Sequence, residues 1–183
     1  GYMVVHDEWF RAPSFMPLVE QSLLDKGGFI RLLGKHEDDV LRPDPRCMLV
    51  YTDNTCGTGD TDGRFSTAQV HDTSWLSRVK CTLHFDYMKQ VDEVASLAGE
   101  FPDMDEGVID KLVKLAALCR TGYRKGEMSL VLSKRQLEQV CKTAPYIGLQ
   151  PAMKCGFHNS LPVEERGVFT ELYRDVMGER WEV

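Results

Sequence analysis

The apolar residues of the chain follow two different spacings, and the change between them divides the sequence. Up to about residue 87, short apolar runs alternate with polar and glycine-rich stretches, as in strands joined by helices and loops. After residue 87, apolar residues recur every three or four positions, which is the spacing of amphipathic helices. We therefore predict two domains, residues 1–87 and residues 88–183.

Three apolar runs of the first domain predict buried strands. They cover residues 2–5, 47–51 and 79–85. Helices are predicted over residues 13–24 and 69–75, and a β-hairpin is predicted from residues 29–33 and 39–41. Buried strands separated by helical or loop segments predict an α/β fold with a parallel sheet.

The second domain is predicted to be entirely α-helical. Five segments have helical spacing, namely residues 91–98, 105–122, 133–144, 152–157 and 163–176. Ser133 is predicted to be an N-cap, because its hydroxyl can accept a hydrogen bond from an exposed backbone N–H group.

Composition and charge exclude some functions. The net charge of −6 argues against nucleic-acid binding as the main activity, since a surface that tracks phosphates needs a basic excess. Arg120, Arg124 and Lys125 form the nearest basic group, which we interpret as a solvated helix end. No apolar run approaches the length that crosses a bilayer, and residues 1–10 do not resemble a signal peptide.

The six cysteines form no CxxC pair and have no histidine pair at zinc-binding spacing. We interpret all six as free thiols, with Cys47, Cys81 and Cys119 as small buried apolar residues. Free thiols predict a reducing compartment, and hence a cytoplasmic protein.

Polar residues that suit magnesium–nucleotide chemistry follow the first two predicted strands. Asp7 and Glu8 come at the end of the first, where one carboxylate can hold Mg²⁺ and the next can activate a water molecule. Asn54 follows the second strand and can position that water. Arg78 and Arg135 can neutralise phosphoryl charge. The alternatives are solvated acids, a turn asparagine and surface salt bridges.

The order of these residues resembles an AAA+ ATPase of the MoxR-like branch. The closest similarity is to the ATPase subunit of the aerobic cobaltochelatase and its relatives, including phage-borne versions. It rests on MVVHDEWFRAPSFMPLVEQSLLDKGGFIRLL, VLRPDPRCMLVYTDNTCGTGD and CRTGYRKGEMSLVLSKRQLEQV. The resemblance covers essentially the whole chain.

This resemblance implies ATP and Mg²⁺ as cofactors and a role for each site residue. Asp7 would be the Walker B magnesium ligand and Glu8 the base that activates water. Asn54 would be sensor one, Arg78 the finger that reaches a neighbouring subunit, and Arg135 sensor two. The chain departs from the family at Ser77 and Val79 beside the finger, and at Lys134 before sensor two.

The phosphate-binding loop is missing, because no GxxxxGK[ST] occurs in the sequence. We therefore expect a fragment of an AAA+ motor, with a partial P-loop core followed by an all-α lid, that is inactive by itself. The alternative is a non-hydrolysing assembly or interaction module. The resemblance further implies a homo-oligomeric ring, by analogy a hexamer, and a partner with an adhesion-type domain. We expect no membrane or nucleic-acid partner.

Overall fold

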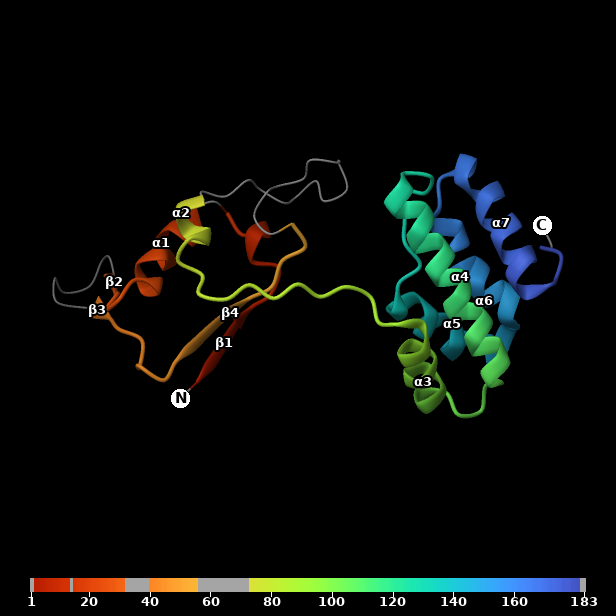
Figure 1. The fold of residues 1–183 in the computed structure, drawn as a ribbon, viewed down its shortest axis with the longest axis horizontal. Coiled ribbons are helices and arrows are strands. Elements are labelled where there is room, and N and C mark those ends of the chain that lie inside the picture. Colours follow the sequence, from red (N-terminus) through yellow and green to blue (C-terminus); the bar gives the residue numbers. More distant parts are fainter. Residues whose placement is uncertain (1, 14, 32–39, 56–72, 182–183) are drawn as a thin grey trace. The chain divides into compact units, whose positions relative to one another are not determined.

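The computed structural model describes residues 2–13, 15–31, 40–55 and 73–181 of the chain. The chain divides into two compact units, residues 1–84 and residues 85–183 (Figure 1). We call them the α/β unit and the helical unit and describe each by itself. The division falls three residues before the boundary that the sequence predicts.

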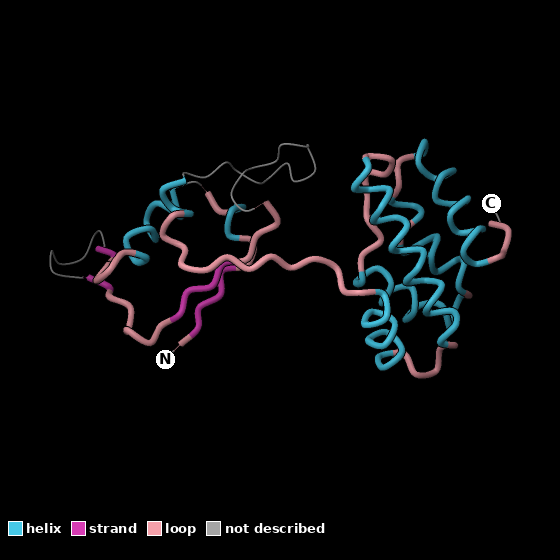
Figure 2. Tube along the Cα trace, in the orientation of Figure 1, coloured by secondary structure: helices cyan, strands magenta, loops and turns pink. Residues whose placement is uncertain are grey.

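A pair of parallel strands organises the α/β unit (Figure 2). Strand β1 (Met3–His6) pairs with β4 (Met48–Tyr51) in a register that places His6 opposite Tyr51. Between them lie the 3-10 helix η1 (Trp9–Arg11), helix α1 (Phe15–Leu24) and the antiparallel strands β2 (Ile30–Arg31) and β3 (Val40–Leu41). Helix α2 (Thr73–Leu76) follows.

These elements confirm the first two predicted strands, the helix before residue 24 and the hairpin. The third predicted strand is wrong, because residues 79–85 form no strand in the structure. A strand depends on hydrogen bonds to a neighbouring strand, and no such partner for this segment exists among the described residues. The hairpin turn, residues 69–72 and the glycine-rich stretch from residue 56 lie outside the described residues.

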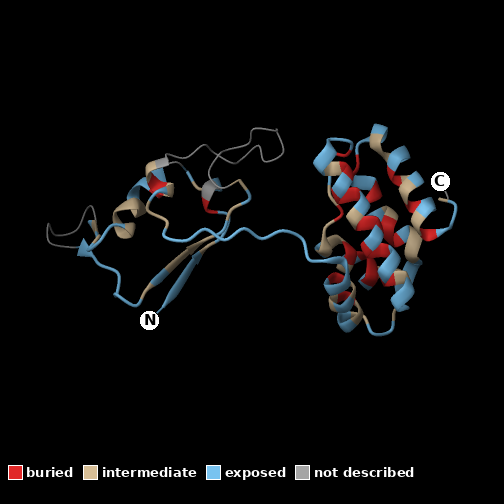
Figure 3. Ribbon diagram, in the orientation of Figure 1, coloured by how far each residue is buried: buried red, intermediate tan, exposed pale blue. Residues whose placement is uncertain are grey.

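The prediction that the first two strands are buried is also wrong, because no residue of β4 is buried either. Strand β1 is the more exposed of the two. Both of its faces are exposed, with Tyr2 80% exposed, Met3 63% and Val5 54%. Only β4 lies beside β1 among the described residues, and the apolar side chains of β1 are exposed there. Figure 3 shows that most of the buried residues belong to the helical unit rather than to the α/β unit.

The small core of the α/β unit lies where β1 and β4 end. Trp9 and Trp75 are buried there, and Tyr51 lies between them at ring-centroid distances of 5.6 and 4.8 Å. The Tyr51 hydroxyl donates to Glu20 of α1 at 3.2 Å, and His6 approaches the same carboxylate at 3.4 Å. Burial, together with the Glu20 charge and hydrogen bond, raises the pKa of Tyr51 above its ordinary value. Glu20 thus ties α1 to the ends of both strands.

The helical unit contains five α-helices and one 3-10 helix in its described residues. They are α3 (Gln90–Glu100), α4 (Glu106–Lys125), α5 (Lys134–Ile147), α6 (Leu149–Gly156), η2 (His158–Ser160) and α7 (Val163–Met177). All five predicted helices are confirmed to within a few residues. No helix in the described part of the chain is long and apolar enough to cross a membrane.

Capping residues set the ends of these helices. The predicted N-cap at Ser133 is confirmed, and Gln136 completes a reciprocal capping box with it. The Asp105 side chain accepts from the Val108 N–H group at the start of α4. Gly126 ends α4 with a φ of 77°, a left-handed conformation that glycine adopts without a steric penalty.

Long helix α4 forms the centre of the helical core. It packs against α3 on one side and α7 on the other, and α5 packs against α6. The largest fully buried side chains include Leu112, Leu115, Leu137, Phe157 and Phe169. Each contributes about 1.5–3 kcal/mol relative to an exposed position.

One ion pair lies inside this core. The Arg120 guanidinium donates to both Glu93 carboxylate oxygens at 2.7 Å and to the Leu132 carbonyl oxygen at 3.0 Å. It also lies 4.0 Å from the centroid of the Tyr87 ring. Arg120 is only 5% exposed and Glu93 only 1%. The interpretation of Arg120 as part of a solvated helix end is therefore wrong.

The five cysteines that the structure describes are free thiols, as predicted. Cys119 and Cys141 are buried, and burial raises the pKa of Cys119 to about 12 and that of Cys141 to about 11. Cys81 is exposed, contrary to prediction, because the strand that was to bury it does not form.

Replacing Arg120 with alanine should destabilise the helical unit by about 3–5 kcal/mol, because it leaves the Glu93 carboxylate buried without its counter-charge. Arg124→Ala provides a matched control on the same helix, since Arg124 pairs with Asp86 at 2.9 Å in an exposed position. Its cost should stay below about 1 kcal/mol. Urea denaturation followed by circular dichroism at 222 nm measures both, and equal losses would contradict the expectation.

Replacing Tyr51 with phenylalanine should destabilise the α/β unit by about 1–2 kcal/mol at neutral pH, because Glu20 loses a hydrogen bond. The raised pKa of Tyr51 adds a pH dependence. Below about pH 10, tyrosine is protonated in both states; at higher pH, it ionises first in the unfolded chain, so stability falls.

Tyr51→Phe should therefore reduce this alkaline loss, while the exposed Tyr146→Phe should not. Urea titrations at pH 8 and pH 10.5 test the difference through the fluorescence of Trp9 and Trp75 in a Trp181→Phe background. An unchanged alkaline slope in Tyr51→Phe would contradict the expectation.

Candidate functional site

The predicted acidic residues and the predicted asparagine leave the sheet at the same end. Asp7 and Glu8 follow β1, and Asn54 follows β4 after two intervening positions. Because β1 and β4 are parallel and in register, both segments emerge at the carboxyl edge of the pair. Ligands of open α/β sheets bind beyond this edge.

Two backbone hydrogen bonds extend the pairing past the strands. The Thr52 N–H group donates to the His6 carbonyl oxygen at 3.0 Å, and the Trp9 N–H group donates to the Thr52 carbonyl oxygen at 3.0 Å. The Asp7–Glu8 backbone is thereby enclosed between two bonds to the opposite segment.

The Thr52 side chain contacts both acidic residues. Its hydroxyl oxygen accepts from the Glu8 N–H group at 3.0 Å, and its proton is donated to Oδ1 of Asp7. Thr52 did not stand out in the sequence, where it is one more polar residue after a strand. Its position two residues before Asn54, opposite the two acids, is the signal that could have identified it.

Glu8 has an unusual backbone conformation. Its φ of 51° and ψ of 43° place it in the left-handed region, and it is the one non-glycine residue with positive φ among the residues that the structure describes. Its carboxylate pairs with the Arg11 guanidinium at 2.5 Å, in a half-exposed position. Outliers of this kind gather at functional sites.

Asn54 lies at an exposed bend whose shape is fixed by its neighbours. Both the N–H group and the hydroxyl of Thr55 donate to Oδ2 of Asp53, at 2.5 and 2.8 Å. This short-range loop presents Asn54 beside the end of β4.

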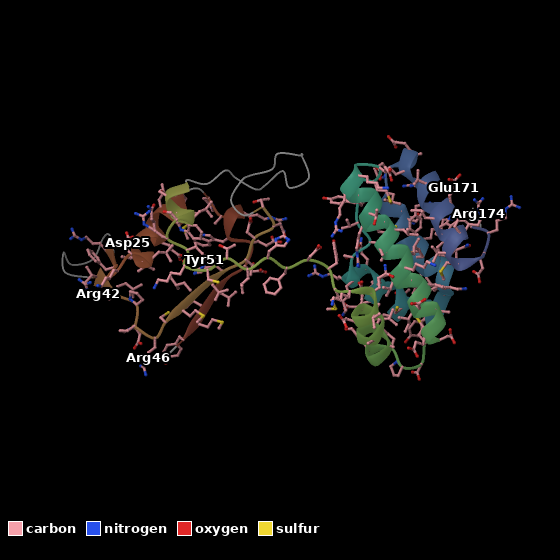
Figure 4. The ribbon with its side chains drawn as sticks, in the orientation of Figure 1. Asp25, Arg42, Arg46, Tyr51, Glu171 and Arg174 are labelled. Atoms are coloured by element: carbon pink, nitrogen blue, oxygen red, sulfur yellow. The ribbon has the colours of Figure 1, made fainter. Side chains whose placement is uncertain are left out.

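The structure places Arg78 in an ion pair within its own chain. Its Nε atom lies 2.9 Å from Oδ1 of Asp25, and its Nη1 atom donates to the Ser74 carbonyl oxygen at 2.6 Å. Asp25 follows α1 and is labelled in Figure 4 together with Tyr51. The guanidinium is therefore already bound, and a role in a neighbouring subunit stays a prediction.

Arg135 belongs to the helical unit, in the first turn of α5. Its side chain is exposed, whereas that of the preceding Lys134 pairs with Glu138. The structure thus groups Asp7, Glu8 and Asn54 at one edge, and the sensor-two role of Arg135 stays a prediction.

The oxygen ligands at the strand edge fit a magnesium ion that is held mainly by a nucleotide. Mg²⁺ uses one or two carboxylates together with water and substrate phosphates. Asp7 supplies one exposed carboxylate, of which Oδ1 is occupied by Thr52. Among the described residues, no three His, Cys, Asp or Glu side chains form a cluster that could hold a metal by themselves.

No protein-family model matches the chain. A curated relative does: the chain is 29% identical over 180 residues to the aerobic cobaltochelatase subunit CobS of Sinorhizobium sp. The match covers 96% of this chain and 54% of the relative, so the chain spans about half the length of the curated relative it matches. Nothing in the comparison concerns phage-borne proteins. It supports a similarity to CobS-like subunits over nearly the whole chain, in agreement with the resemblance in the sequence.

Proposed function

We propose that this chain is the ATP-hydrolysing part of an AAA+ remodelling subunit. The observation that carries the proposal is the parallel pairing of β1 and β4, which brings Asp7, Glu8 and Asn54 to one sheet edge. Asp7 would hold Mg²⁺, Glu8 would activate the attacking water, and Asn54 would position that water beside the terminal phosphate of ATP. The similarity to CobS supports this assignment.

The phosphate-binding loop of the proposed enzyme comes from outside these 183 residues. No GxxxxGK[ST] occurs in the sequence, and the matched relative is almost twice as long as the match. The exposed apolar faces of β1 favour the same proposal, because parallel strands are normally covered on both faces. The 183 residues alone are expected to have no turnover.

The two arginines complete the proposed site in a ring. Arg78 would serve the ATP of a neighbouring subunit, which requires its release from Asp25. Arg135 would contact the bound nucleotide, and the helical unit that carries it would act as a lid. We extend the proposal to a homo-oligomeric ring, a hexamer by resemblance, and to a partner with an adhesion-type domain.

A second candidate is a non-hydrolysing assembly module. The ion pair of Glu8 with Arg11 favours it, because the guanidinium occupies the carboxylate that hydrolysis would need to contact water. The two candidates differ in one measurable property, which is ATP turnover by the full-length gene product.

Glu8→Gln in the full-length gene product should abolish turnover while nucleotide binding persists. The amide keeps the shape of the side chain but cannot accept a proton, so kcat should fall by about 100-fold or more. Phosphate release with Mg²⁺ measures turnover, and a fluorescent ATP analogue measures binding. Glu171→Gln, on an exposed position of α7 labelled in Figure 4, is the control and should behave as wild type.

Wild-type turnover in Glu8→Gln would remove Glu8 from its proposed role. A wild-type protein that carries a phosphate-binding loop and still shows no turnover would favour the assembly module.

A further inference from the structure

We propose that Thr52 is a positioning residue of the hydrolysis site, whose hydroxyl fixes the geometry of Asp7 and Glu8. The inference rests on the proposed function and adds a residue to it. Thr52 touches neither nucleotide nor water in the proposed mechanism, and acts through the two carboxylates.

Thr52 is bonded to four consecutive residues of the opposite segment. Its backbone bonds reach His6 and Trp9, and its side-chain bonds reach Asp7 and Glu8. The backbone bonds continue the parallel ladder and would exist with any residue that has an N–H group. The hydroxyl bonds are specific to serine or threonine, so they can be removed without touching the ladder.

The hydrogen bonds of the Thr52 hydroxyl determine which oxygen of Asp7 is left for a metal ion. A hydroxyl has one proton and two lone pairs. Because the Thr52 oxygen accepts from the Glu8 N–H group, its proton is available for Oδ1 of Asp7. This leaves Oδ2 of Asp7, which accepts no hydrogen bond from the described residues, as the oxygen for Mg²⁺. One side chain thereby orients the proposed magnesium ligand.

The same hydroxyl supports the left-handed turn at Glu8. A glutamate with φ of 51° persists only when its surroundings stabilise that conformation. The bond from the Glu8 N–H group to Thr52 holds the centre of the turn, and the bond from Trp9 holds its far side. Without the hydroxyl, the Glu8 backbone can relax and its carboxylate leaves the position needed to activate water.

Two substitutions separate the hydroxyl from the rest of the residue. Thr52→Val keeps the β-branched shape and both backbone bonds but removes the hydroxyl. Thr52→Ser keeps the hydroxyl and removes a methyl group. Because Thr52 is exposed, neither change creates a buried cavity.

Amide hydrogen exchange in the full-length protein tests the bond itself. In Thr52→Val, the Glu8 amide should exchange roughly tenfold faster, as expected for the loss of one hydrogen bond. The Trp9 amide is an internal control, because its acceptor is the Thr52 carbonyl oxygen, and its exchange should not change. Thr52→Ser should resemble wild type at both amides. Unchanged exchange at Glu8, or equal acceleration at both amides, would overturn the proposal.

Turnover and magnesium dependence test the consequence for the reaction. Thr52→Val should lower kcat by roughly 10- to 100-fold and raise the Mg²⁺ concentration for half-maximal rate, as for other residues that orient metal ligands. The KM for ATP should stay near the wild-type value, and Thr52→Ser should restore the rate. A merely structural role would not produce this separation or this rescue.

The Glu8→Gln variant distinguishes the two possible failures. If Glu8→Gln is inactive but Thr52→Val matches wild type in rate and Mg²⁺ dependence, the positioning role is overturned and the proposed function stands. If wild type and Glu8→Gln do not differ in turnover, the proposed function fails and the positioning role in hydrolysis fails with it. Loss of rate in Thr52→Val with rescue by Thr52→Ser supports both.

Discussion

The parallel pairing of β1 with β4 is the interaction on which the candidate site depends. The segments that carry the acids and the asparagine are about 45 residues apart in the sequence. Only the register of the two strands brings them together, with His6 opposite Tyr51 as the last pair. Beyond that pair, Thr52 continues the contact to Trp9, so the acidic turn is part of the sheet edge rather than a free loop.

The packing around this edge is uneven. Next to the turn formed by Asp7 and Glu8, the side chains of Trp9, Tyr51 and Trp75 form a small aromatic core. Glu20 of α1 is bonded to this core through the Tyr51 hydroxyl. Towards the start of β1, the apolar side chains are exposed on both faces. The described residues thus hold the polar groups at the edge in place, while they leave both faces of β1 exposed.

Helix positions in the second half follow closely from the sequence, because local spacing and caps such as Ser133 determine them. Residues 79–85 show why strands are harder to predict: their alternation suits a strand, yet the partner strand is a property of the fold and not of the segment. The same limit applies to Arg120, whose partner Glu93 lies on another helix. In the site, Asp7, Glu8 and Asn54 could be identified from the sequence because they follow predicted strands. The contacts of Thr52 with Glu8 and Asp7 join residues 44 and 45 positions apart, so only the fold shows them.

Asp86 and Tyr87 lie at the start of the helical unit, before its first helix α3. Arg124 holds Asp86 and Arg120 lies against the Tyr87 ring, so both residues are attached to α4. Residues 81–85 form neither helix nor strand, and Phe85 is 86% exposed. The side-chain contacts that attach the chain to α4 therefore begin at Asp86, close to the start of the helical unit. Arg120 thus joins Tyr87, which precedes α3, to Glu93 within α3, so loss of this one side chain would remove contacts at the start of the helical unit as well as inside its core.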